Sequence, residues 1–205
     1  MHRILSASKD TYITNKIIKN SFRATDANVG AAGTLDLFKL YNENKLSGVT
    51  NPIELSRLLI KFPVNEIATM DTNGDIDVND SSFQCIVKLH DVYGGQTTPS
   101  KFNVILFPLA KQFDEGTGMN VATYSDVDAT NFITASITNG TAVAWNEPGA
   151  KASGSLGGSN LDVYVSGSLA GPSGTSTVSL SPMQYFETGE EDLLIDVTTI
   201  VSGTI

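Results

Sequence analysis

Four short stretches in the first third of the chain decide its fold: SKDTYITN (Ser8–Asn15), NVG (Asn28–Gly30), LDLFKLY (Leu35–Tyr41) and SRLLIKF (Ser56–Phe62). The last two show a period of two, at which strand side chains alternate between the faces of a sheet, although Lys39 interrupts the apolar positions of the third stretch. Pro63 ends the fourth stretch, because proline has no N–H to offer a neighbouring strand. The pattern predicts strands joined by turns.

Composition agrees with an all-β chain. Hydrophobic residues make up 40% of the 205 residues, charged residues only 17%, and there are 18 glycines. This mixture suits short strands and many turns better than long helices. A chain of this length can form one large β-domain, so we expect a single domain over residues 1–205 with long loops.

Charge and cysteine content exclude several classes of protein. The net charge of -9 argues against binding to duplex nucleic acid, which needs clustered lysine and arginine. Cys85 is the only cysteine, so no intrachain disulfide can form. No apolar run reaches the ~18 residues that cross a bilayer, and Met1–Ser6 lacks the apolar core of a signal peptide. We therefore expect a protein made in a cytoplasm, with no membrane partner.

Further strands are predicted where β-favouring residues cluster. They cover residues 83–90, 102–109, 132–137 and 161–165. Phe102–Leu109 is apolar on both faces, which predicts a central strand that is covered on both sides.

Turns and loops are predicted between these strands. Tyr93–Gln96 fits a tight reversal, and the glycine-rich segments Ser153–Ser159 and Ala170–Ser176 are expected to be flexible loops. Glu54–Ile60 and Leu193–Val201 are the only segments whose sequence is compatible with helical turns.

Three later motifs extend the opening pattern: FDEGTG (Phe113–Gly118), VAWNEPGA (Val143–Ala150) and LIDVTTIV (Leu194–Val201). In this order the motifs resemble DNRLRE-type β-sandwich modules, whose pattern runs D-T-Y-[IV], N-x-G, S-R-x-L-[IL]-K-F, W-x-E-G, W-x-x-P-G-A and L-x-x-D-V-T-x-[LI]-V. Many such modules occur in cell-surface and carbohydrate-handling proteins. The resemblance implies a jelly-roll-like antiparallel β-sandwich without catalytic activity.

The sequence motifs more closely resemble a form of this domain that is found as a virion structural protein of marine tailed bacteriophages. ELSRLLIKFP (Glu54–Pro63) is shared, and so is the W-x-E-G-x-G-[LM]-[DN]…Y-[ST]-D tract (Phe113–Asp126), with Phe113 in place of tryptophan. The resemblance implies a non-enzymatic component of the virion, in the tail or decorating the capsid. Its partners would be other virion proteins and a host glycan. The alternative is a carbohydrate-binding module of a cell-surface or carbohydrate-active protein.

The family pattern continues after D-V-T with strands that contain N-x-G-[FI], whereas this sequence stops at Ile205. Either the last strands are missing or a neighbouring subunit supplies them, because an open sheet edge pairs readily with another chain. We expect a homo-oligomer or a lattice-bound protein. A stable monomer would contradict strand donation.

The segment from Asp71 to Asp77 is the best candidate for a metal site, as a calcium-binding loop. Asp71, Asn73, Asp75 and Asp77 place oxygen donors at alternate positions, as calcium loops do. However, Ile76 occupies the position at which an EF-hand needs glycine, and Ser82 replaces the bidentate glutamate. The competing interpretation is a solvated Asn-Gly turn between strands, with no cofactor bound.

Exposed aromatic rings would carry glycan binding, since sugars stack on the faces of tryptophan and tyrosine. The candidates are Trp145, Tyr124 and Tyr93. The family resemblance implies instead that Trp145 packs against the sandwich, and we favour that structural role.

No catalytic group is predicted. Asp114 and Glu115 are adjacent, so on a strand they point to opposite faces and cannot form a glycosidase pair by themselves. Asp126 and Asp128 are expected to keep a long loop soluble. His90 is expected at the surface, and Cys85 in the core as an inert thiol.

Overall fold

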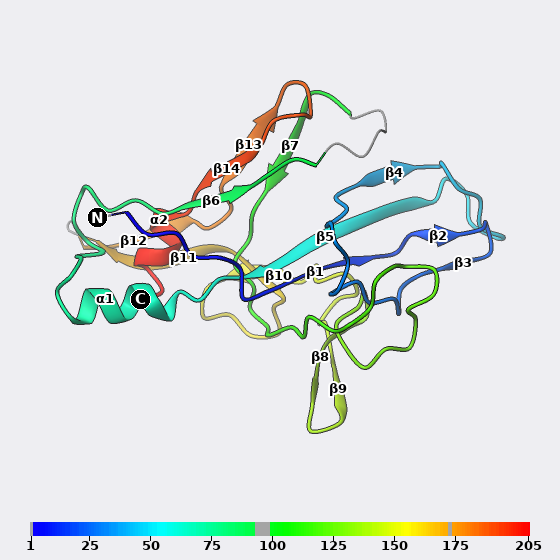
Figure 1. Ribbon diagram of the computed structural model, residues 1–205, viewed down its shortest axis with the longest axis horizontal. Helices are drawn as coiled ribbons and strands as arrows, with labels where there is room; N and C mark the ends of the chain where they lie inside the picture. Colours follow the sequence, from blue (N-terminus) through cyan, green and yellow to red (C-terminus); the bar gives the residue numbers. More distant parts are fainter. Residues whose placement is uncertain (1, 93–98, 172–173) are drawn as a thin grey trace. The chain divides into compact units, whose positions relative to one another are not determined.

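The computed structural model describes residues 2–92, 99–171 and 174–205. Within these residues it contains fourteen strands and two short helices, which confirms an all-β fold (Figure 1). Neither helix in this part of the chain is long and apolar enough to span a bilayer.

The elements follow one another along the chain with these bounds: β1 (Lys9–Thr14), β2 (Ile17–Ile18), β3 (Phe22–Arg23), β4 (Lys39–Tyr41), β5 (Ile53–Lys61), α1 (Asn65–Thr72), β6 (Ile86–Leu89), β7 (Phe102–Ile105), β8 (Thr134–Thr138), β9 (Thr141–Ala144), β10 (Ser153–Ser155), β11 (Val163–Gly171), β12 (Gly174–Ser179), β13 (Met183–Phe186), β14 (Leu193–Asp196) and α2 (Thr198–Ser202).

The described chain forms two compact units, each assembled from separate segments. The first unit contains residues 1–63, 111–152 and 160–162, and the second contains residues 64–110, 153–159 and 163–205. The expectation of one sandwich domain stays a prediction.

The first unit is built on the antiparallel sheet β1-β5-β4. β5 includes Ser56–Lys61 of the predicted strand at Ser56–Phe62, and these residues pair with β1, with Tyr12 opposite Leu58. Ile13 and Leu59 are buried in the core of this unit. The predicted strand at Leu35–Tyr41 is formed only at its end, as β4.

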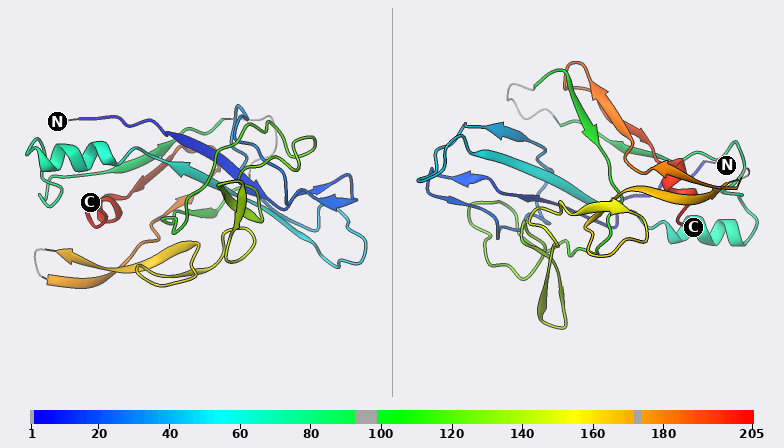
Figure 2. Two further views of the ribbon diagram at one scale, coloured as in Figure 1. Left: turned by 90° about the horizontal axis from the view of Figure 1, so that it is seen from below. Right: turned by 180° about the vertical axis from the view of Figure 1, so that it is seen from behind.

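A hairpin of β8 and β9 projects from the first unit (Figures 1 and 2). Its turn is Asn139-Gly140, and both residues have positive φ, 51° and 74°. These angles are typical of a type I′ turn, which matches the natural twist of two antiparallel strands. All four residues of β9 are exposed.

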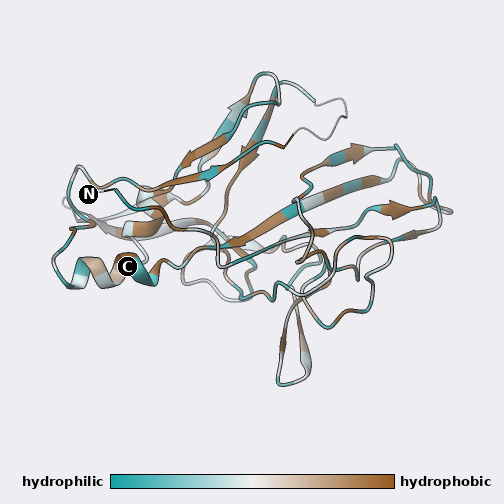
Figure 3. Ribbon diagram, viewed as in Figure 1, coloured by the Kyte–Doolittle hydropathy of each residue, from teal (hydrophilic) through white to brown (hydrophobic). Residues whose placement is uncertain are grey.

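The second unit contains two antiparallel ribbons, β6–β14 and β7–β13, and the sheet β10-β11-β12. Its apolar core holds Ile195, Val197 and Val201, with Val87 among the partly buried neighbours. The Phe102 and Phe186 rings stack with centroids 5.0 Å apart. Figure 3 shows the hydrophobic residues of these strands in brown.

Several local predictions were wrong. β7 is not a covered central strand: it pairs with β13 only, and Ile105 is exposed. Glu54–Ile60 is strand rather than helix. Helix α1 was not predicted because its sequence has no clear apolar stripe. In the structure, none of its residues is buried.

The glycine-rich segments also differ from expectation. Ser153–Ser155 forms β10, which pairs in parallel with β11, and the predicted loop at 170–176 overlaps the ends of β11 and β12. Leu193–Val201 is divided between strand β14 and helix α2. The tight reversal predicted at Tyr93–Gln96 lies outside the described residues.

Candidate functional site

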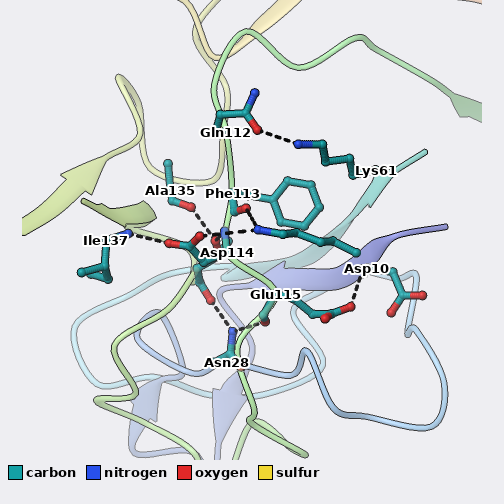
Figure 4. A network of polar contacts seen from close by, with 11 residues as sticks. Asp10, Asn28, Lys61, Gln112, Phe113, Asp114, Glu115, Ala135 and Ile137 are labelled. Atoms are coloured by element: carbon teal, nitrogen blue, oxygen red, sulfur yellow. Dashed lines mark hydrogen bonds and ion pairs between the residues drawn. The ribbon is translucent and has the colours of Figure 1, made fainter. Parts of the chain in front are cut away.

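Asn28, from the N-x-G motif, belongs to a polar network in the first unit (Figure 4). Its side chain is fully buried. The amide nitrogen donates to the carbonyl oxygens of Glu115 and Thr130, at 2.9 and 2.8 Å. The amide oxygen accepts the N–H groups of Gly30 and Gly118, at 3.2 and 2.9 Å. One side chain thus holds three separate segments together; we call it the Asn28 clamp.

Glycine is required beside this clamp because two backbones approach closely. A Cβ atom at Gly30 would lie 1.9 Å from the Glu115 carbonyl oxygen, and one at Gly118 would lie 1.9 Å from the Asn28 carbonyl oxygen. No side chain fits at such distances. The glycines of N-x-G and F-D-E-G-T-G are therefore needed for packing.

Asp114 and Glu115 cover the edges of two different strands (Figure 4). The Asp114 carboxylate accepts the Ile137 N–H of β8 at 2.7 Å, and the Glu115 carboxylate accepts the Asp10 N–H of β1 at 2.8 Å. Lys9 lies 3.8 Å from Asp114. The two acids do not face each other across a common space, so their geometry is that of backbone acceptors.

Asp162 plays a similar part in the tryptophan loop, VAWNEPGA. Its fully buried carboxylate accepts the N–H groups of Asn146, Glu147 and Ala152, at 2.7, 3.0 and 3.1 Å. Lys111 Nζ lies 3.8 Å away and compensates the charge. This loop is fixed by charge-assisted hydrogen bonds to backbone.

Arg57 of β5 holds the other side of the same loop. Its guanidinium donates to the Gly149 carbonyl oxygen. Burial lowers the pKa of this guanidinium, and the nearby Asp162 carboxylate opposes that shift. Arg57 belongs to the S-R-x-L motif, so residues from two distant motifs meet here.

Glu54 completes the set of buried acids in this unit. Its carboxylate accepts the Ile17 N–H at 2.6 Å, and both of its oxygens lie within 3.1 Å of the Asn44 amide nitrogen.

Tyr12 on β1 has a raised pKa. Burial and the Asp36 carboxylate raise it to about 12, and the Tyr12 hydroxyl donates to Asp36 at 3.4 Å.

The four predicted calcium ligands are not gathered around a common point. Asp71 lies in the last turn of helix α1 and accepts the Val78 N–H at 2.9 Å, while Asp77 accepts the Asn79 N–H at 2.8 Å. Asn73 is the C-cap of α1 and Gly74 follows with φ of 76°, so this turn ends a helix and does not join two strands. Among the described residues, no three His, Cys, Asp or Glu side chains, Asp75 included, are arranged to hold a metal ion.

Of the predicted glycan-binding rings, the structure describes those of Trp145 and Tyr124. Trp145 is only 4% exposed, and its indole N–H donates to the Asn131 carbonyl oxygen at 2.9 Å. A buried ring offers no face to a sugar, so Trp145 serves the core. Tyr124 is half-buried in a loop, and Tyr93 lies outside the described residues.

The two remaining titratable candidates lie in the second unit. His90 is exposed, and its Nδ1 lies 3.0 Å from the Asp192 carboxylate. It is therefore a surface histidine, as predicted. Cys85 is half-buried against the apolar core, where burial raises the pKa of its thiol. A raised thiol pKa disfavours the reactive thiolate.

Sequence reasoning did not identify the functions of Asn28 and Asp162. The N-x-G motif that contains Asn28 was recognised, but the four hydrogen-bond partners of Asn28 lie up to 102 positions away.

A scan against protein-family models and searches of the curated proteins and the solved structures each find no match to this chain.

Proposed function

We propose that this chain is a non-enzymatic structural protein of a tailed-bacteriophage particle, a tail component or a decoration of the capsid. The observation that carries the proposal is the use of the motif side chains. Asn28, Asp114 and Glu115 all form hydrogen bonds to backbone groups of distant segments, and so does Asp162, which lies outside the motifs. Such side chains fix loops.

Catalysis would need the opposite arrangement. A general acid or base must reach a proton of the substrate, and a glycosidase pair must flank the scissile bond. Here Asp114 and Glu115 each accept a backbone N–H from a different strand, β8 and β1. This division of roles supports a structural function.

The bacteriophage assignment rests on the sequence resemblance. The tracts ELSRLLIKFP and Phe113–Asp126 carry it, and both contribute to the first unit. Glu54 and Arg57 of the first tract bond to backbone of other segments, as does Glu115 of the second. Side chains that fix the backbone of distant segments are consistent with a structural protein that is present in many copies.

Assembly is supported by apolar side chains that the second unit leaves in solvent. Ile105 and Met183 lie opposite each other on β7 and β13 and are 44% and 60% exposed. Larger exposed apolar patches mark surfaces that contact other proteins, and we propose that this pair belongs to one.

Quantitative mass spectrometry of density-gradient-purified particles tests the proposal. We expect this chain to co-purify with the major capsid protein in many copies per particle, through repeated gradients and washes in high salt. Its absence from such particles would overturn the proposal. A glycan array on the purified chain, with Tyr124→Ala as control, would then test the carbohydrate-binding alternative.

A further inference from the structure

The sheets of this protein share a device that covers their open edges with side chains. Glu115 Oε1 accepts the Asp10 N–H on β1, Asp114 Oδ2 accepts the Ile137 N–H on β8, and Gln184 Oε1 accepts the Leu194 N–H on β14 at 2.5 Å. A covered N–H cannot pair with a strand of another molecule, and natural sheets commonly protect their edges.

The edge of β9 lacks such a cover at Ala142. Ile137 directs its N–H away from the hairpin, toward Asp114, so the Ile137–Ala142 pair is one of the non-hydrogen-bonded pairs of the ladder. Ala142 therefore directs its N–H and C=O away from β8, where the described residues place no hydrogen-bond partner. Farther along, Lys111 Nζ donates to the Ala144 carbonyl oxygen at 2.7 Å and marks the end of the open stretch.

The residues of this hairpin also carry none of the charges that natural edges use for protection. No Lys, Arg, Asp, Glu or His occurs from Asn131 to Asn146. β9 is Thr-Ala-Val-Ala, and its small side chains let a second backbone approach. An exposed, uncharged strand whose outer edge is unpaired is a template for strand addition.

A hollow of about 370 Å³ lies beside the hairpin and has an acidic wall. Ile133, Ile137 and Ala142 line it on the hairpin side. The other lining residues include Asp26, Asp126 and Asp128, and no lysine or arginine lines the hollow. A hollow lined by both apolar residues and acids is complementary to side chains with an apolar stem and a cationic head.

We propose that the β9 edge and this hollow bind an extended segment of a partner protein that carries lysine or arginine at alternate positions. The segment adds to the hairpin as a third strand through Ala142. One of its faces places cationic side chains beside Asp126 and Asp128. A second copy of this chain fits less well, because it brings the same three carboxylates and a net charge of -9.

This inference adds an attachment surface to the proposed function, and it is tested without any phage particle. The probe is a fluorescein-labelled octapeptide with lysine at every second position and threonine or valine between, and the control peptide has glutamate in place of each lysine. We expect fluorescence anisotropy at low salt to show binding of the lysine peptide, and binding at least tenfold weaker for the glutamate peptide.

Variants separate the two parts of the surface. Asp126→Asn with Asp128→Asn should weaken binding of the lysine peptide five- to tenfold, since both acids are exposed and asparagine tolerates the positive φ of Asp126. The matched control is Asp75→Asn with Glu190→Gln, two exposed acids outside the hollow, and it should leave binding unchanged. Ala142→Pro removes the outward N–H and should abolish binding.

Hydrogen exchange gives a readout that does not depend on a variant folding. Adding the lysine peptide should slow exchange of the Ala142 amide at least tenfold. Unchanged exchange at saturation, or equal binding by the Asp126/Asp128 variant and its control, would overturn the proposal. Dimers of the free chain in sedimentation velocity that dissociate on Ala142→Pro would overturn it in favour of a second copy. Failure here leaves the virion test above unaffected, and the reverse also holds.

Discussion

In the first unit, buried polar side chains such as Asn28 and Asp162 accept or donate hydrogen bonds to backbone of remote segments, whereas the second unit buries apolar residues such as Phe186 and Ile195. All nine buried polar or charged residues of the described chain belong to the first unit. Many of its loops are therefore fixed by directional bonds, which are costly to break once desolvated. The second unit buries no polar side chain among the described residues, so its core depends mainly on apolar packing.

The chain carries one natural probe for each unit. Trp145 is its only tryptophan and lies in the first unit, and Cys85 is its only cysteine and lies in the second. Tryptophan fluorescence during urea unfolding and reaction of the thiol with a colorimetric disulfide reagent can therefore follow the two units separately.

The largest effect is expected from Asp162→Ala. The change leaves three backbone N–H groups without an acceptor and Lys111 without its counter-charge, so it should lower the free energy of unfolding by about 3–5 kcal/mol. Urea unfolding followed by Trp145 fluorescence measures it. Asp192→Ala, at a partly exposed acid of the second unit, is the control, and reaction of the Cys85 thiol should show that it changes stability little. Equal losses from the two would contradict the contrast between the units.

Ile195→Ala tests the second unit by removing packing. Ile195 is 2% exposed on the inner face of β14, so its truncation should cost about 3 kcal/mol and speed the reaction of Cys85. Leu194→Ala, its neighbour on the outer face, is 55% exposed and should have an effect within about 0.5 kcal/mol. If Leu194→Ala were as damaging, the outer face would be part of the core.

Gly30→Ala tests the close approach at the Asn28 clamp. The added methyl group overlaps the Glu115 carbonyl oxygen, so the backbone must shift and the loss should be about 2 kcal/mol. Gly33→Ala is the control in the same loop, because its Cβ would meet nothing within 4 Å. Trp145 fluorescence again reports the transition. A tolerated Gly30→Ala would mean that this segment packs less tightly than the structure has it.

These contrasts also explain what the sequence could and could not predict. Alternation of apolar residues identified β5 and β6, because a period of two depends only on nearby positions. It could not identify the Asn28 clamp, whose bond to Glu115 spans 87 positions. It also could not show that β7 would have one neighbour, because partners are chosen by tertiary packing. Trp145 was correctly favoured as a core residue, but its partner, the Asn131 carbonyl oxygen, was not foreseen.

The smallest effect should be a gain in stability, from Thr11→Val. Thr11 is fully buried on β1, and its hydroxyl has no hydrogen-bond partner among the described residues. Valine has nearly the same shape and removes the desolvated hydroxyl, so stability should rise by about 1 kcal/mol.

The matched control for this change is Thr14→Val on the same strand. Thr14 is equally buried, but its hydroxyl donates to the Leu55 carbonyl oxygen at 2.7 Å and accepts the Lys16 N–H at 3.1 Å. Its replacement should lower stability by about 1–2 kcal/mol. Opposite signs for two threonines three positions apart would show that the first unit gains stability from polar groups only where they are paired. A loss at Thr11 would show instead that its hydroxyl has a partner, such as a bound water molecule.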